Sequence, residues 1–264
     1  MDSGARFAAT SELLLDRDSP TMRLHFLAFG LVGYLAALLP MVYLVGFLAN
    51  VGVSKSVDSG PAGPTGTALA VDLTLLLAFA LLHSLLARPA AKARLAAHFP
   101  AELERSLYSL VAGAQIALLC WLWQPLPVPV WSVPAEWAAL RLLLWTIQGT
   151  GWGIVVLALL TIGSAHLFGL RQAWAGARQV PHEPPPIESR GIYRRIRHPI
   201  YAGTLVGFWA TPEMSQGRLL LVGVLTIYLF IGLRFEEREL ERAFGETYLA
   251  HRRAVPGLLP RLGK

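Results

Sequence analysis

Residues 24–49 read LHFLAFGLVGYLAALLPMVYLVGFLA, an apolar run that contains no Asp, Glu, Lys or Arg. A helix needs about 20 predominantly apolar residues to cross the ~30 Å hydrocarbon core of a bilayer. This run meets that length, and so do two further apolar segments at roughly 67–87 and 106–123. The sequence therefore predicts helices that span a membrane.

A fourth apolar segment, at roughly 137–165, is longer than a span requires. Excess length predicts that this helix is tilted. Small residues allow neighbouring membrane helices to approach closely, so we expect its glycines to serve helix packing. They are Gly149, Gly151, Gly153 and Gly163.

The chain after Pro199 has a different pattern. Residues 200–211 are apolar, polar residues and glycine then interrupt the run, and residues 218–233 are apolar again. At 1.5 Å per residue the first arm is only ~18 Å long, which is short for an independent span. We therefore predict a paired helical hairpin over residues 199–235.

The composition supports a membrane protein. Of 264 residues, 54% are hydrophobic and 15% are charged, and the mean hydropathy is +0.49. Soluble domains carry about 25% charged residues. The single cysteine, Cys120, excludes an internal disulfide, and no metal site is predicted. The predicted fold class is an all-α polytopic integral membrane protein with four long transmembrane helices and a C-terminal helical hairpin.

The basic residues predict the orientation of the chain. They gather at 88–105, 166–198 and beyond 233, whereas the connection at 124–134 has neither Lys nor Arg. Cytoplasmic loops carry an excess of Lys and Arg, so the three basic segments are expected in the cytoplasm. The same rule explains the net charge of +6, and no nucleic-acid partner is predicted.

These boundaries predict three regions. Residues 1–22 read as a polar N-terminal tail, not as a signal peptide, because acidic residues occur where a signal would be basic and then apolar. Residues 23–165 hold the four transmembrane helices. Residues 166–264 are expected to form the catalytic region, with the hairpin at 199–235 and a cytoplasmic tail.

Most clusters of polar and charged residues lie in the last hundred residues of the sequence. Pro199 suits the first turn of a helix, which places Arg197 and His198 at a helix N-terminus that favours anionic groups. Tyrosines flank this point, and Glu236 and Glu237 directly follow an apolar arm. The set fits a zwitterionic, aromatic ligand. The alternative is that the arginines at 194, 195 and 197 anchor the helix and pair with one of the glutamates.

Two segments carry a resemblance to a known superfamily. GIYRRIRHPIYAG (191–203), followed by RFEERELERAFGETYLAHRRAVPGLLP (234–260), resembles the C-terminal half of the isoprenylcysteine carboxyl methyltransferases. Those are integral-membrane enzymes that use S-adenosylmethionine. Further segments, at 43–61, 77–93, 104–112, 123–127 and 166–174, look like the bacterial methanethiol S-methyltransferases.

The resemblance implies roles for particular residues. It implies an S-adenosylmethionine site formed by cytoplasmic segments, with Glu236 as the carboxylate that binds the cofactor. Residues around His166 match the segment that closes over the cofactor. The expected cofactor-binding residues are Tyr193, His198, Pro199, Ile200, Tyr201, Glu236, Arg171 and Gln172. Apart from the resemblance, a nearby arginine or a histidine base would raise the ionised fraction of a thiol acceptor, and the candidates for this role are Arg197, Arg234 and His166.

The implied function is methylation of a small thiol, methanethiol to dimethyl sulfide, at a membrane-embedded site. The expected partners are a small lipophilic thiol and membrane lipids, and the expected location is the bacterial cytoplasmic membrane with the cofactor site facing the cytoplasm. Two alternatives stay open. One is the same chemistry on an isoprenoid or prenylcysteine carboxylate or another lipophilic acceptor, and the other is a non-catalytic membrane scaffold of the same fold.

Overall fold

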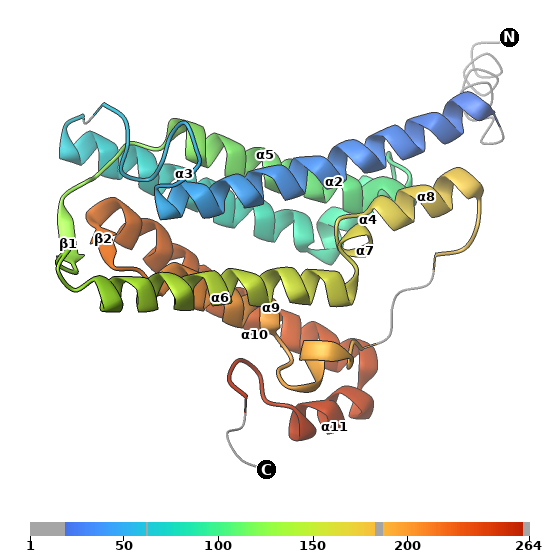
Figure 1. Cartoon of the computed structure of the whole chain (residues 1–264). Coiled ribbons are helices and arrows are strands. Elements are labelled where there is room, and N and C mark those ends of the chain that lie inside the picture. The colour runs from blue at the N-terminus through green and yellow to red at the C-terminus, as the bar shows by residue number, and fades with distance from the viewer. Residues whose placement is uncertain (1–18, 62, 183–186, 261–264) are drawn as a thin grey trace, which may run out of the picture. The chain divides into compact units, whose positions relative to one another are not determined.

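The structure is a computed structural model, and it describes residues 19–61, 63–182 and 187–260 (Figure 1). Among these residues, five helices are long and apolar enough to cross a membrane. They are α2 (Pro20–Ala49), α3 (Thr65–Ala87), α5 (Ala101–Leu122), α6 (Ala138–Ile162) and α10 (Gln216–Phe244). The first four match the four predicted spans, and the fifth contains the second arm of the predicted hairpin. The all-α polytopic fold class is confirmed.

The predicted hairpin is strongly asymmetric. Its first arm is α9 (Pro199–Trp209), which has 11 residues, whereas α10 has 29 residues. At 1.5 Å per residue, α9 is only ~16 Å long and cannot cross a ~30 Å hydrocarbon core. Helix α10 continues past the predicted end at 235, because the Glu- and Arg-rich sequence that follows favours helix. Both adjacent glutamates therefore lie on a helix.

Most of the remaining elements are short. They are α4 (Pro89–Ala96), α7 (Ser164–Leu167), α8 (Leu170–Arg178), the 3₁₀ helix η1 (Gly191–Arg194), α11 (Glu246–Ala254), β1 (Pro129–Ser132) and β2 (Glu213–Ser215). The predicted N-terminal tail lies outside the described residues up to residue 18, and α2 begins at Pro20. Part of the proline-rich stretch at 181–191 also lies outside them.

The strand pair was not predicted. Within the connection at 124–134, β1 pairs with β2 in antiparallel register, with Trp131 opposite Met214. The indole N–H of Trp131 also donates a hydrogen bond to the carbonyl oxygen of Thr211 at 3.2 Å. Two inter-helix connections thus satisfy some of each other's backbone hydrogen-bonding groups.

The chain forms two compact units, which we describe separately. Of the described residues, unit 1 comprises 19–41, 83–115 and 165–182, and unit 2 comprises 42–61, 63–82, 116–164 and 187–260. Unit 1 has a small core of Phe26, Leu103, Ala173 and Ala177. Gly169 has a φ of +91° there, and its carbonyl accepts a hydrogen bond from the Ser106 hydroxyl at 3.1 Å.

Unit 2 has the larger core, and glycines bring α6 against α9 within it (Figure 1). A Cβ on Gly151 would lie 2.7 Å from the carbonyl oxygen of Gly203, so only glycine permits this approach. The prediction that glycines of this segment serve packing is thus confirmed for Gly151. It is wrong for Gly149 and Gly153, which face open space among the described residues. Gly163 has a φ of +84° and ends α6.

Candidate functional site

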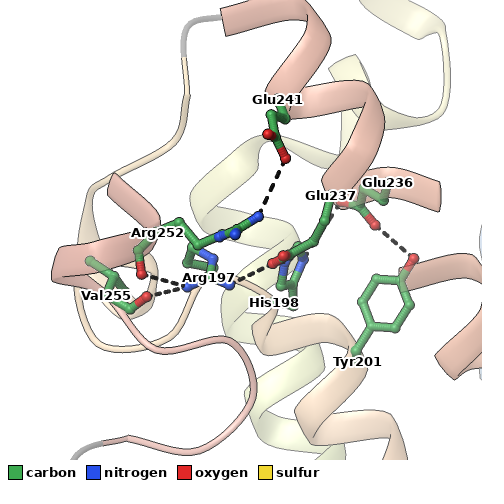
Figure 2. A network of polar contacts seen from close by, with 8 residues as sticks. All are labelled: Arg197, His198, Tyr201, Glu236, Glu237, Glu241, Arg252 and Val255. Atoms are coloured by element: carbon green, nitrogen blue, oxygen red, sulfur yellow. Dashed lines mark hydrogen bonds and ion pairs between the residues drawn. The ribbon is translucent and has the colours of Figure 1, made fainter. Parts of the chain in front are cut away.

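The polar cluster of unit 2 is built where η1 gives way to α9 (Figure 2). Pro199 is the first residue of α9, where a missing N–H costs nothing and the fixed φ suits the helix. His198 immediately precedes the helix, and its side chain is only 3% exposed. The buried imidazole therefore needs polar partners from elsewhere in the unit, and α10 supplies them.

Glu237 is the first of these partners. Its Oε1 atom lies 2.9 Å from Nε2 of His198 and 2.5 Å from Nη2 of Arg197 (Figure 2). A carboxylate only accepts hydrogen bonds, so Nε2 of His198 carries the proton that is shared with Glu237. The sequence had left open which glutamate pairs with the arginines, and the structure selects Glu237 for Arg197.

Glu236, the adjacent residue, has a different environment. Its Oε2 accepts a hydrogen bond from the Tyr201 hydroxyl at 2.7 Å, and its Oε1 lies 3.8 Å from Nδ1 of His198. The second distance is longer than a hydrogen bond. The side chain is 44% exposed. Glu236 therefore presents a carboxylate that is oriented by tyrosine and still accessible to a ligand.

Tyr193 is a buried residue of η1 close to the same carboxylate. Burial raises the pKa of its hydroxyl to about 12, and the negative charges of Glu236 and Glu188 add to this effect. The phenol therefore stays protonated near neutral pH and can donate a hydrogen bond. The other expected cofactor residues of this stretch have apolar side chains: Pro199 is buried and Ile200 is partly buried.

The backbone N–H groups of Arg197 and His198, which immediately precede α9, are engaged within the chain. The backbone N–H of Arg197 donates to the carbonyl of Pro256 at 2.9 Å, and that of His198 donates to the carbonyl of Gly257 at 3.0 Å. The C-terminal segment occupies these two donors, and the predicted preference of the helix N-terminus for an anionic ligand stays a prediction. Sequence reasoning missed Pro256 and Gly257, because backbone carbonyls have no signature in a sequence.

The arginines of this region separate into two kinds. Arg194 and Arg195 are exposed, as expected of anchors at a membrane border. The Arg197 side chain is only 10% exposed. Arg234 is exposed and makes no hydrogen bond or ion pair with another residue that the structure describes. Its predicted role in thiol activation stays a prediction.

Three predicted residues lie in unit 1. The His166 ring stacks on that of His182 with the centroids 5.0 Å apart. Burial lowers the pKa of His166, and the charges of His182, Arg105 and Arg171 lower it further. The side-chain amide of Gln172 donates to the carbonyl of His166 at 3.0 Å, and Arg171 is exposed. Their predicted part in the reaction stays a prediction.

Comparisons with known proteins place this chain among membrane methyltransferases. Residues 150–247, which include His198, Tyr201 and both glutamates, match the family model described as phospholipid methyltransferase. A methanethiol S-methyltransferase from a Pseudomonas species is 40% identical over 239 residues, which cover 90% of this chain and 91% of that protein. The chain belongs to the methanethiol S-methyltransferase family.

Further matches agree with this membership. The family member from Mycobacterium tuberculosis is 39% identical over 232 residues, covering 88% of this chain and 94% of that protein. Nurim from Xenopus laevis is 31% identical over 179 residues, which cover 65% of this chain and 62% of nurim. No solved structure matches the chain. Membership in the family confirms the resemblance found in the sequence and identifies the chain as an integral-membrane methyltransferase.

Proposed function

We propose that this protein transfers a methyl group from S-adenosylmethionine to methanethiol and releases dimethyl sulfide. The named relatives carry the choice of acceptor. The structural observation that carries the choice of site is Glu236, an accessible carboxylate held by Tyr201 beside the buried His198. A charged group at the end of a membrane span is a functional candidate because it is costly to keep there.

The side chains of the cluster fit S-adenosylmethionine. Its amino group would bind the accessible carboxylate of Glu236, because an ammonium and a carboxylate form a charge-assisted hydrogen bond. The rings of Tyr193 and Tyr201 offer faces for the positively charged sulfur. His198 would lie beside the bound amino-acid portion, with its ring fixed by Glu237.

When bound, S-adenosylmethionine supplies a methyl group on a positively charged sulfur, which is already a good leaving group. A thiolate held in line with that methyl group would take it with its own electron pair, and the methyl–sulfonium bond would break with its electron pair left on the departing sulfur. No acid is needed, so the protein's task is to align the reactants and exclude water.

The acceptor must lose a proton before it attacks. The thiol of cysteine has an ordinary pKa of about 8.5, and the pKa of a small alkyl thiol lies near or above that value, so only a minority is ionised near neutral pH. We propose His166 as the proton acceptor, because its lowered pKa keeps the imidazole neutral. Arg234 is the candidate cation for stabilising the thiolate, since its guanidinium has no partner among the described residues. Arg197 is already engaged with Glu237.

We further propose that the protein resides in the bacterial cytoplasmic membrane with the 193–237 cluster facing the cytoplasm. The basic segments support this orientation. A small apolar thiol partitions into the bilayer, which gives a physical reason for embedding such an enzyme in the membrane. Arg171 and Gln172 keep their proposed contact with the cofactor on the basis of sequence alone.

The choice of acceptor is tested by competition. Purified protein in lipid nanodiscs is supplied with S-adenosylmethionine and with methanethiol, a prenylated cysteine or both. We expect turnover on methanethiol and no turnover on the prenylated cysteine, because the relatives that span the chain are named for methanethiol. A higher kcat/KM for the prenylated cysteine would overturn the acceptor and leave the methyl-donor site intact.

A further inference from the structure

Residues 255–257, which we call the C-terminal strap, lie across the junction between η1 and α9. The backbone N–H groups of Arg197 and His198 donate to the carbonyls of Pro256 and Gly257 at 2.9 and 3.0 Å. The guanidinium of Arg197 donates from Nη1 to the carbonyl of Arg252 at 3.1 Å and also to that of Val255 (Figure 2). The strap is therefore tied to the residue that precedes His198 and to His198 itself.

Arg197 joins this strap to α10. While Nη1 bonds the two carbonyls, Nη2 forms the 2.5 Å ion pair with Glu237. The same oxygen of Glu237 holds the His198 ring at 2.9 Å. A planar guanidinium can serve carbonyls and a carboxylate together in a fixed geometry, which a lysine ammonium cannot.

Helix α11 also contributes side chains near Arg197, Glu237 and His198. Tyr248 is 1% exposed, and burial raises the pKa of its hydroxyl while Glu237 and Arg197 act on it with opposite signs. Burial lowers the pKa of His251, and the charges of Arg197 and His198 lower it further. Both residues therefore lie within electrostatic reach of the pair, and α11 brings the strap to it.

We infer that Arg197 is a positioning residue, which couples the C-terminal strap to Glu237 and thereby fixes His198 for the methyl donor. The inference rests on the proposed methyl-donor site and deepens it. It also reassigns Arg197, because a guanidinium engaged by two carbonyls and a carboxylate is not available to stabilise a thiolate. The competing role, direct thiol activation, makes different predictions for pH dependence.

The strap is tested first by hydrogen exchange, which needs no activity. The variant that ends at Ala254 keeps all of α11 and removes the strap, whereas a matched variant that ends at Pro260 keeps it. In the variant that ends at Pro260, we expect the backbone amides of Arg197 and His198 to exchange about as slowly as in the full chain. In the variant that ends at Ala254, we expect both amides to exchange much faster. Unchanged exchange in the shorter variant would overturn the inference.

Kinetics then separate positioning from thiol activation. For Arg197→Ala and for the chain ending at Ala254, we expect the KM for S-adenosylmethionine to rise about 10- to 100-fold, since small misplacements near reacting groups cost this much. When the substitution and the truncation are combined, the KM should rise no further than in the more severe of the two single variants, because both changes disrupt the same coupled unit. Arg197→Lys should behave much like Arg197→Ala, and Arg253→Gln, an exposed control, should behave like the wild type.

Two results would contradict the positioning role. One is recovery of Arg197→Ala activity at high pH, which would show that the arginine serves to ionise the thiol. The other is a rise in KM in the combined variant that equals the product of the rises in the two single variants, which would show that the strap and Arg197 act independently. If the shorter chain fails to fold, Arg197→Lys with its pH profile decides the question alone. Wild-type turnover on methanethiol is measured in parallel, so failure of the proposed function is recognised separately.

Discussion

Replacing Glu236 with alanine is expected to weaken binding of S-adenosylmethionine by about 100-fold or more while the protein stays folded and inserted in the membrane. Removing one member of a charge-assisted pair at a binding site costs this much, because the ligand's ammonium is left without a partner. The fold should tolerate the change, since the Glu236 side chain is 44% exposed and its hydrogen bond to Tyr201 is the one it makes among the described residues. Isothermal titration calorimetry in nanodiscs measures the affinity directly.

Two further variants test whether the loss of cofactor affinity is specific to the carboxylate of Glu236. Glu239→Ala removes an exposed acidic residue of the same helix and should leave the affinity unchanged. Tyr201→Phe removes only the hydroxyl that orients Glu236, and we expect an intermediate loss of roughly fivefold to tenfold, the value of one hydrogen bond. Wild-type affinity in Glu236→Ala would show that the cofactor carboxylate lies elsewhere.

Replacing Glu237 with alanine is expected to damage both stability and activity. The Arg197 and Glu237 side chains are 10% and 23% exposed, and Glu237 also holds the buried His198. Breaking a largely buried ion pair by removing one partner costs about 3–5 kcal/mol, because the other charge is left uncompensated. We therefore expect a clear fall in the midpoint of thermal unfolding in detergent and loss of methyl transfer.

The matched control for Glu237 is Glu241, one turn further along α10. Its ion pair with Arg252 is 3.4 Å long, and the two side chains are 46% and 45% exposed. Exposed pairs of this kind contribute about 0–1 kcal/mol, so Glu241→Ala should scarcely change the unfolding midpoint. Equal losses of stability in the two variants would mean that the Glu237 cluster does not act as a buried unit.

The spans were predictable from the sequence because the physical requirement is simple. An apolar run of sufficient length is enough to indicate a membrane helix, and α2, α3, α5 and α6 follow the predicted segments closely. The short first arm of the hairpin was visible for the same reason. The pairing of β1 with β2 was not, because it joins connections far apart in the chain and depends on where the helices end.

The cluster was predictable only in part. The motifs indicated that His198, Tyr201 and one glutamate belong together, and the structure joins them. The sequence could not assign the separate duties of Glu236 and Glu237, because neighbouring residues on a helix point about 100° apart and the helical phase is fixed by packing. It also could not show the strap, since Pro256 and Gly257 contribute backbone carbonyls, which every residue possesses.

The central claim is methyl transfer to a small thiol by a site that contains Glu236. The most direct measurement supplies purified protein with methanethiol and S-adenosylmethionine carrying a deuterated methyl group, and analyses the headspace by mass spectrometry. We predict dimethyl sulfide that carries the label with the wild-type protein and with Glu239→Ala, and none above background with Glu236→Ala. Absence of labelled product from the wild type, or undiminished product from Glu236→Ala, would contradict the account.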